Sequence, residues 1–261
     1  MTRVRNPAVA GLFYPDDPVV LRQTVEALLG ESAVAGPAPK ALIAPHAGYI
    51  YSGPIAATVY GRLASVRHAI RRVVLLGPSH RLAFHGLALC RAEAFLTPLG
   101  PVPVDPAAPD LLADLAQVHM NEAAHAGEHS LEVHLPFLQV VLSDFKLVPL
   151  VVGDASPDAV AEVLDRLWGG PETLIVVSSD LSHYHDYATA RRLDGETSQL
   201  IENLSRVEID GEHACGCRPI NGLLRAARSH GLKASVLDVR SSGDTAGPRD
   251  RVVGYGAYAF A

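Results

Sequence analysis

The sequence predicts an α/β fold: a single domain with a mostly parallel central sheet and helices on both faces. Strand-like and helix-like segments alternate along the chain, as expected for parallel strands joined by crossover helices. Several of the strands are apolar on both faces, which is typical of buried parallel strands. No internal repeat, low-complexity tract or long flexible linker divides the sequence. We therefore expect one domain spanning residues 1–261.

The N-terminal half begins with residues 1–16, which are too irregular for a helix and too apolar for a free tail. We expect them to pack on the domain as an arm. Asp17, followed by a proline, is expected to start a helix that ends near Gly30, and Ala33–Pro39 reads as a Pro/Gly loop. The elements expected next are a strand at Ala41–Ala44, a helix from Ser52 to about Leu63 with Pro54 near its first turn, strands at Val73–Leu76 and Phe84–Cys90, a proline-rich connection at Phe95–Pro106, and a helix at Asp105–Val118.

The C-terminal half opens with a polar, histidine-rich stretch, Met120–His129. Pro136 is expected in the first turn of the following helix or at a kink in it. Gly231 is a typical residue just after a helix, so it is expected to end a helix over residues 218–230. The elements expected in this half are helices at Ser130–Leu142, Ser156–Trp168, Ala188–Leu204 and 218–230, and strands at Phe145–Val152, Leu174–Val177, Ala234–Val239 and Val252–Phe260, the last two around a loop at Ser241–Asp250.

Composition is that of an ordinary globular protein, with 48% hydrophobic and 19% charged residues. The formal net charge of −6 argues against a nucleic-acid partner, because phosphate binding needs clustered Lys and Arg. The N-terminus lacks the apolar segment of a signal peptide, and no apolar run approaches the ~20 residues that span a bilayer. Three cysteines, an odd number, do not indicate a disulfide framework. We expect a cytoplasmic protein with no membrane contact.

Three predicted strands end in a histidine. His46 follows the first strand of the sheet, His80 follows Gly77-Pro78-Ser79, and Asp180 and His183 follow the strand at Leu174–Val177. Ligands of open α/β sheets bind at the carboxyl ends of the strands, so these side chains indicate one shared site. Imidazoles and a carboxylate are ligands expected for catalytic iron or zinc. Asp180 could bind the metal, orient His183 or cap a helix.

A second polar cluster, Glu128-His129-Ser130-Leu131-Glu132-Val133-His134, resembles a zinc-binding helix but matches neither H-E-x-x-H nor H-x-x-E-H. Glu128 and Glu132 are four residues apart and can share a helix face, whereas His129 and His134 are five apart and diverge. We interpret this cluster as a wall of the pocket that offers acid–base groups or hydrogen bonds to a substrate.

Cys215 and Cys217 lie just before Pro219, which can occupy the first turn of helix 218–230. A thiol near a helix N-terminus is expected to have a lowered pKa, which favours the thiolate. One C-x-C pair is weak evidence for a zinc ribbon, which needs two pairs. One thiolate could instead complete a site formed by the strand-end histidines.

Taken together, these motifs resemble the Memo family, known in prokaryotes as AmmeMemoRadiSam system protein B. The matching segments occur in family order over nearly the whole chain, which is more specific than any single motif. They are Arg5–Gly11 with Phe13–Pro15, Pro45–Tyr49 with Tyr51–Gly53, Gly77–His80, Glu128–Pro136, Ser178–His183, and Cys215-Gly216.

The family is similar in structure to class III extradiol dioxygenases, in which two histidines and a glutamate bind non-haem Fe(II). The resemblance implies that His46 and His80 are metal ligands and that Cys215 is the third. It implies further that Asp180 and His183 belong to the pocket. A thiolate in place of a carboxylate softens the site toward iron, copper or zinc, so ring cleavage does not carry over automatically.

This sequence departs from the family pattern after the cysteine, with Cys217-Arg218 where an Arg-His pair is common. The departure either places a second thiol near the metal or alters the rim of the pocket. Cys215 stays the better ligand candidate.

The resulting hypothesis is a metal-dependent redox enzyme that uses iron (Fe²⁺), with copper or zinc as alternatives. His183 would act as acid or base and Asp180 would tune it. The residues expected to contact an unknown small molecule or peptide are Tyr49, Tyr51, Glu128, His129 and His134.

Two other functions fit the same residues. The pocket could recognise a peptide or a partner protein without catalysis, and the prokaryotic family name implies functional association with a radical-SAM protein and an AMMECR1-type protein. The third reading is a zinc hydrolase, which would be colourless and contain stoichiometric zinc.

Overall fold

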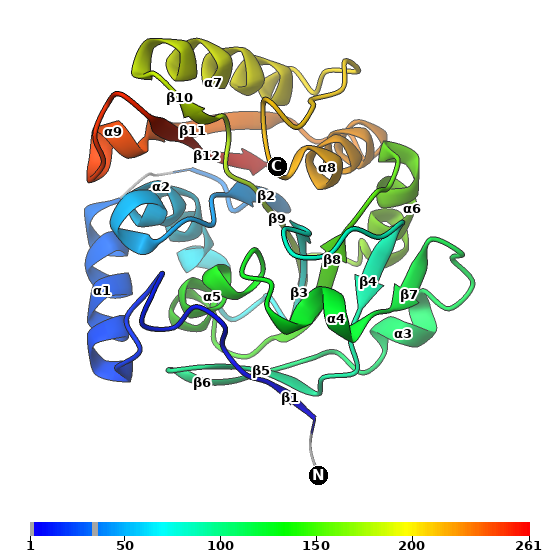
Figure 1. Ribbon diagram of the computed structural model, residues 1–261. Helices are drawn as coiled ribbons and strands as arrows, with labels where there is room; N and C mark the ends of the chain where they lie inside the picture. The colour runs from blue at the N-terminus through cyan, green and yellow to red at the C-terminus, as the bar shows by residue number, and fades with distance from the viewer. Residues whose placement is uncertain (1–2, 33–35) are drawn as a thin grey trace.

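The computed structural model describes residues 3–32 and 36–261 of the chain. A mixed sheet crosses the molecule (Figure 1), with strand order β10-β12-β2-β9-β3-β8-β4-β7, and β11 pairs with β12. The bounds of these strands are β10 His183–His185, β12 Val252–Phe260, β2 Ala41–Ala44, β9 Thr173–Ser178, β3 Arg72–Pro78, β8 Lys146–Val152, β4 Leu87–Leu89, β7 Val118–Met120 and β11 Ala234–Ser241.

The centre of this sheet is parallel. Strands β2, β9, β3 and β8 run in the same direction, so their carboxyl ends meet at one edge. Antiparallel strands flank this centre, with β12 beside β2 and β4 beside β8. Antiparallel neighbours need no crossover helix, which explains how short segments extend the sheet on both sides. The predicted α/β fold is confirmed.

Helices cover both faces of the sheet, as expected. Side chains of β3 alternate between two core clusters, with Val73 and Leu75 in one and Val74 and Leu76 in the other. The first cluster includes side chains of α1 (Pro18–Glu31), α2 (Tyr49–Tyr60) and α5 (Leu135–Val141), and the second those of α6 (Pro157–Leu167), α7 (Tyr187–Glu202) and α8 (Cys217–Ser229). The shorter helices are α3 Ala108–Leu111, α4 Glu122–Ala126, α9 Ser242–Thr245, and the 3-10 turns Gly61–Val66 and Glu132–His134.

The prediction that Phe95–Pro106 is an irregular connection is wrong, because most of this segment belongs to a β-hairpin. Strands β5 (Ala94–Thr97) and β6 (Gly100–Pro103) pair antiparallel, and β1 (Val4–Arg5) adds to β5 in parallel. The two prolines of β6 are tolerated because β6 is an edge strand of this three-stranded sheet. The helix expected at Asp105–Val118 shrinks to α3, and its later part becomes turns and β7.

Two helices begin at other residues than expected. Helix α2 starts at Tyr49, which places Pro54 inside the helix instead of in its first turn. Helix α5 starts at Leu135, after a 3-10 turn, and has Pro136 in its first turn as one of the two expectations stated. Strand β10 was not predicted. Residues 33–35 of the predicted loop Ala33–Pro39 lie outside the described residues.

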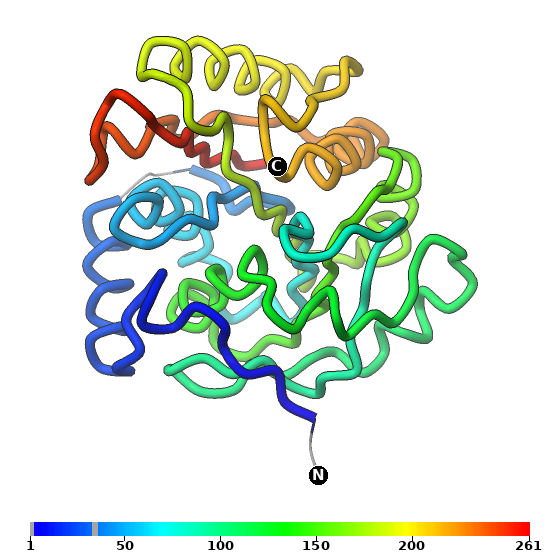
Figure 2. Tube along the Cα trace, in the orientation of Figure 1, coloured from blue at the N-terminus to red at the C-terminus, as the bar shows by residue number. Residues whose placement is uncertain are grey.

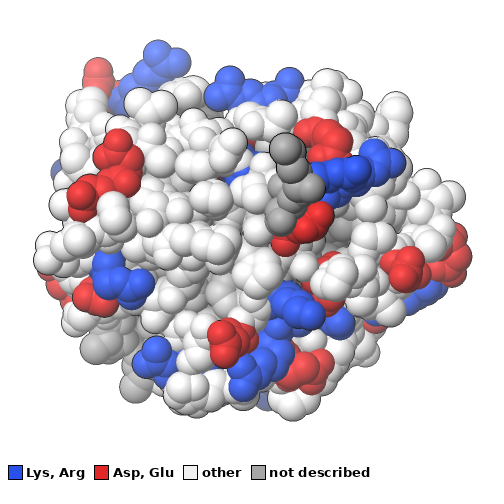
Figure 3. Space-filling view, turned by 90° about the horizontal axis from the view of Figure 1, so that it is seen from below, with Lys and Arg blue, Asp and Glu red and all other residues white. Residues whose placement is uncertain are grey.

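Charged side chains of both signs are interspersed on the face of the molecule that Figure 3 shows, without a single basic patch. In the described part of the chain, none of the helices combines the length and the apolar character that crossing a bilayer requires.

One buried carboxylate, that of Glu132, makes several of the hydrogen bonds that hold residues 3–16 of the N-terminal arm on the domain. Figure 2 shows the arm, in dark blue, passing beside the green segment that carries this residue. Glu132 accepts hydrogen bonds from the guanidinium of Arg5, the main-chain N–H groups of Ala8 and Val9, and the hydroxyl of Tyr14. The side chains of Arg5 and Glu132 are 7% and 0% exposed, so this ion pair is screened from water.

We predict that Glu132→Gln lowers the free energy of unfolding by about 3 kcal/mol or more, because it leaves the buried Arg5 without a counter-charge. Urea denaturation measures this change. Glu26→Gln is the matched control, because Glu26 is half exposed and pairs with Arg22 on the surface of α1. Its effect should stay below about 0.5 kcal/mol. Equal effects of the two variants would show that the arm does not depend on Glu132.

Candidate metal centre

Three side chains predicted as metal ligands converge at the carboxyl edge of the parallel strands. His46 lies two residues after β2, His80 two residues after β3, and Cys215 two residues before α8. One donor atom from each of the three lies within 4.8 Å of the other two, and Sγ of Cys215 is 3.5 Å from Nε2 of His46. This separation suits ligands that share one ion, and the identity of the ion stays a prediction.

His46 is buried and held on two sides. Its main-chain N–H donates to Oδ1 of Asp180 at 2.8 Å, and its Nδ1 lies 2.6 Å from Oγ of Ser178. Burial, and next the neighbouring imidazole of His80, lower the pKa of His46 well below its ordinary value. The ring is therefore neutral at neutral pH, as a metal ligand must be.

His80 is bound by the carboxylate of Glu128. Its Nδ1 lies 2.8 Å from Oε1, and its main-chain N–H donates to Oε2 at 2.6 Å. Burial alone would raise the pKa of Glu128, but its hydrogen bonds and electrostatic interaction with His80 bring it down to about 2. Glu128 is therefore a carboxylate that orients the ring of His80.

Cys215 occupies a tight site between strand and helix. A Cβ atom on Gly216 would lie 2.6 Å from the carbonyl oxygen of Ser178, so only glycine fits at that position. The expected lowering of the thiol pKa is wrong for this geometry. Burial, and next the nearby Asp180, raise the pKa of Cys215 above its ordinary value, because loss of hydration disfavours the charged thiolate. Without a metal, Cys215 is a neutral thiol.

Asp180 lies beside the three donors. Its Oδ1 accepts from the main-chain N–H of His46, and its Oδ2 is 4.0 Å from Nε2 of the same residue. Burial raises the pKa of Asp180 to about 6, although the electrostatic interaction with His183 opposes this rise. His183 is the first residue of β10 and lines the same cavity.

A cavity of about 820 Å³ opens over these groups. Its floor carries the three converging donors together with Asp180, and its walls include two residues expected to contact a substrate, Tyr51 and His129. Three apolar side chains at its rim are strongly exposed, with Leu12 at 80%, Ile50 at 69% and Tyr184 at 63%. The cavity thus combines a polar floor with an apolar rim.

Three other residues expected to contact a substrate lie away from the cavity wall. The hydroxyl of Tyr49 donates to the carbonyl oxygen of Val133 at 2.7 Å, deep in the core. Nδ1 of His134 is 2.8 Å from the hydroxyl of Tyr60, and Glu128 lies behind His80. A direct contact with a molecule in the cavity is therefore open to Tyr51 and His129, but not to these three in this conformation.

His129 packs against the metal-site histidines. Its ring stacks on that of His80 with centroids 4.7 Å apart, and burial together with His80 lowers the pKa of His129 to about 4. His80, Glu128 and His129 form a second group with donor atoms within 4.8 Å. Glu128 already accepts the main-chain N–H groups of His80 and Ser130, and its Oε1 lies 2.8 Å from Nδ1 of His80, so the first group is the better candidate metal site.

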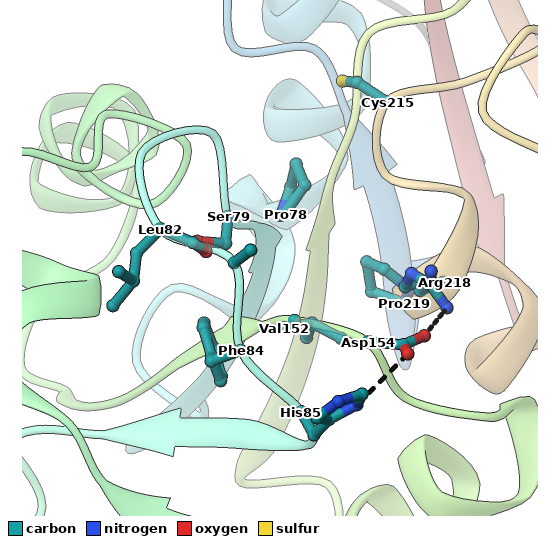
Figure 4. Close-up of a pocket in the computed structure, with 12 residues that line it drawn as sticks. Pro78, Ser79, Leu82, Phe84, His85, Val152, Asp154, Cys215, Arg218 and Pro219 are labelled. Atoms are coloured by element: carbon teal, nitrogen blue, oxygen red, sulfur yellow. Dashed lines mark hydrogen bonds and ion pairs between the residues drawn. The ribbon is translucent and has the colours of Figure 1, made fainter.

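Figure 4 shows a second cavity, of about 460 Å³, with Cys215 at its edge. The carboxylate of Asp154 pairs there with Nδ1 of His85 at 3.2 Å and with Arg218 at 2.6 Å. This group of ion pairs was not predicted, because its three residues are far apart in the sequence and form no recognisable motif. Cys217 lines a different pocket and is not one of the converging donors.

Ser178 was also missed as a partner of His46. The sequence did offer a signal, because Ser178 lies at the end of a predicted strand, directly before Ser179-Asp180. A hydroxyl at that place can form a hydrogen bond with a histidine at the end of a neighbouring strand.

The chain resembles known proteins over almost its whole length. The family model described as "Memo-like protein" matches residues 5–259. A "MEMO1 family protein" from Aquifex aeolicus is 37% identical and covers 97% of both chains. Another from Aeropyrum pernix is 37% identical and covers 98% of this chain and 99% of its own.

A crystal structure of an uncharacterized protein from Escherichia coli K12 has a similar fold. The TM-score is 0.56 and the sequence identity 14%, with 84% of this chain and 98% of that chain covered. This likeness bears on the fold alone. On the family model and the identities of its relatives, the chain belongs to the Memo-like protein family.

Proposed function

We propose that this protein binds one redox-active metal ion through His46, His80 and Cys215 and uses it to oxidise or reduce an organic molecule held in the adjoining cavity. The observation that carries the proposal is the convergence of two imidazoles and one thiol within 4.8 Å at the floor of a cavity. Iron in the ferrous state is the proposed ion, and copper is the redox-active alternative. Zinc has no redox chemistry and would instead fit the zinc hydrolase.

The donor set supports an ion of intermediate softness. Two imidazoles suit iron, copper and zinc, and a thiolate selects against magnesium and calcium, which prefer oxygen ligands. With only three protein donors, a bound ion would keep room for a further ligand from the cavity, as catalytic metal sites do. A bound iron or copper ion would supply electron transfer and polarisation of an oxygen-containing group.

The neighbouring residues are proposed to manage protons. Asp180, with a pKa of about 6, can hold or release a proton near neutral pH. His183 lies in the cavity wall, where it can exchange a proton with a bound molecule. Tyr51 and His129 are proposed to contact that molecule from the side walls.

A second candidate function rests on the exposed rim of the cavity. Leu12, Ile50 and Tyr184 offer apolar surface to the solvent around a polar floor. Such a rim also fits recognition of a peptide without turnover. Catalysis requires the metal, whereas recognition by the rim does not, so His46→Ala should abolish a reaction but spare peptide binding.

We predict that the purified protein binds about one Fe(II) per chain under anaerobic conditions. Cys215→Ser should weaken binding by more than about 100-fold, because even loss of a group that orients a ligand costs 10–100-fold. Metal analysis after dialysis and calorimetric titration measure this. Cys217→Ser is the matched control and should bind like the natural protein, because Cys217 is not among the converging donors. Equal affinities of the two variants would contradict the assignment of Cys215.

We predict further that metal binding releases about one proton from the Cys215 thiol near pH 7. The raised pKa keeps this thiol protonated in the free protein, and a metal binds the thiolate. Affinity should therefore rise about tenfold per pH unit below the pKa of the thiol. Titration calorimetry in buffers of different ionisation enthalpy counts the proton. Undiminished release by Cys215→Ser would assign the proton to another group.

A further inference from the structure

Each of the two histidines of the candidate metal centre has a hydrogen-bond partner at Nδ1. Both partners belong to residues 128–130 or are bonded to them. His80 meets the carboxylate of Glu128, and His46 meets the hydroxyl of Ser178. Ser178 in turn meets the main-chain carbonyl of Ser130. Residues 128–130 therefore support both rings, although they contribute no donor to the group of His46, His80 and Cys215.

The hydrogen bonds of Glu128 determine where the proton of His80 lies. Oε2 accepts from the main-chain N–H of His80 at 2.6 Å, and Oε1 accepts from the main-chain N–H of Ser130 at 2.9 Å. Both oxygens thus serve as acceptors, as in a carboxylate, which has no proton to give. Nδ1 of His80, 2.8 Å from Oε1, must then be the donor. In the neutral ring this leaves the lone pair on Nε2.

The hydrogen bonds of Ser178 likewise determine which ring nitrogen of His46 carries the proton. A serine hydroxyl has a single proton, and a carbonyl oxygen can only accept. Oγ of Ser178 lies 2.6 Å from the carbonyl oxygen of Ser130 and uses its proton there. Nδ1 of His46, also 2.6 Å from Oγ, must then donate. The lone pair of this ring is again on Nε2, the atom 3.5 Å from Sγ of Cys215.

The supporting segment is itself fixed to the end of β3. Oγ of Ser130 donates to the carbonyl oxygen of Pro78 at 2.8 Å. A Cβ atom on Gly77 would lie 2.7 Å from that Oγ, so the glycine permits this close approach. The strand that delivers His80 and the segment that orients it are therefore locked together.

We propose that Glu128, Ser130 and Ser178 are positioning residues that hold His46 and His80 in the Nδ1–H form, with both Nε2 lone pairs directed to one ion before it binds. The use of these lone pairs rests on the proposed function, whereas the proton positions do not. A partner on the second ring nitrogen commonly fixes the orientation of a metal-binding histidine and raises its basicity. Here Glu128 does this directly for His80, and Ser130 does it for His46 through the hydroxyl of Ser178.

Long-range ¹⁵N–¹H NMR on the metal-free protein tests the proposal, because it distinguishes the two ring forms. At about pH 8, above the ordinary histidine pKa, His46 and His80 should both be in the Nδ1–H form. Glu128→Ala should shift His80 toward the Nε2–H form and spare His46. Ser178→Ala should do the reverse. An Nε2–H form of either ring in the natural protein would overturn the proposal, whether or not the variants fold.

Ser182→Ala is the matched control for Ser178→Ala. Ser182 is buried in the adjoining loop, and its hydroxyl has no hydrogen-bond partner among the described residues. Ser182→Ala should leave His46 and His80 in the Nδ1–H form. If it shifts His46 as much as Ser178→Ala does, the positioning role is refuted.

Metal affinity gives an independent readout, with a loss of about 10–100-fold expected for Glu128→Ala and for Ser178→Ala. Glu128→Asp, which keeps the carboxylate, should recover part of that loss. Affinities equal to that of the natural protein would refute the positioning role. Nδ1–H rings in a protein that binds no metal would support the positioning and contradict only the proposed function.

Discussion

A buried carboxylate must find hydrogen-bond donors or give up its charge, and the segment that carries Glu128 and Glu132 meets this condition twice. Glu132 takes its donors from the N-terminal arm, including Arg5 and Tyr14. Glu128 takes its donors from His80 and Ser130. Because the two residues are four apart, one short stretch connects the arm to His80 of the candidate metal centre.

The N-terminal arm also forms part of the cavity wall. Phe13 lines the cavity and packs against the ring of His129, at a centroid distance of 5.0 Å. The main-chain N–H of Tyr49 donates to the carbonyl oxygen of Phe13, which joins the arm to the start of α2. A cavity wall built in this way depends on contacts between residues more than thirty positions apart in the chain.

Sequence analysis predicted the parts that depend on local patterns. Apolar runs ending at His46 and His80 indicated strand ends, and the parallel sheet brings those ends together. Cys215 as the third donor came from the family resemblance, because its spacing alone left several roles open. The role of Glu128 as the partner of His80 could not be predicted, because hydrogen bonds between distant turns leave no periodic signal. Ser178 did offer a signal, its place at the end of a predicted strand beside Asp180, and that signal was missed. The β5–β6 hairpin was missed because its prolines argued against a strand.

The central claim is that two imidazoles and one thiolate hold a single ion. X-ray absorption spectroscopy of the protein loaded with zinc as a probe ion tests it most directly. If His46, His80 and Cys215 hold the ion, the spectra should give one sulfur at about 2.3 Å and two nitrogens at about 2.0–2.1 Å from it. The sulfur should be lost in Cys215→Ser. A coordination shell of nitrogen and oxygen alone in the natural protein would show that Cys215 is not a ligand of the ion.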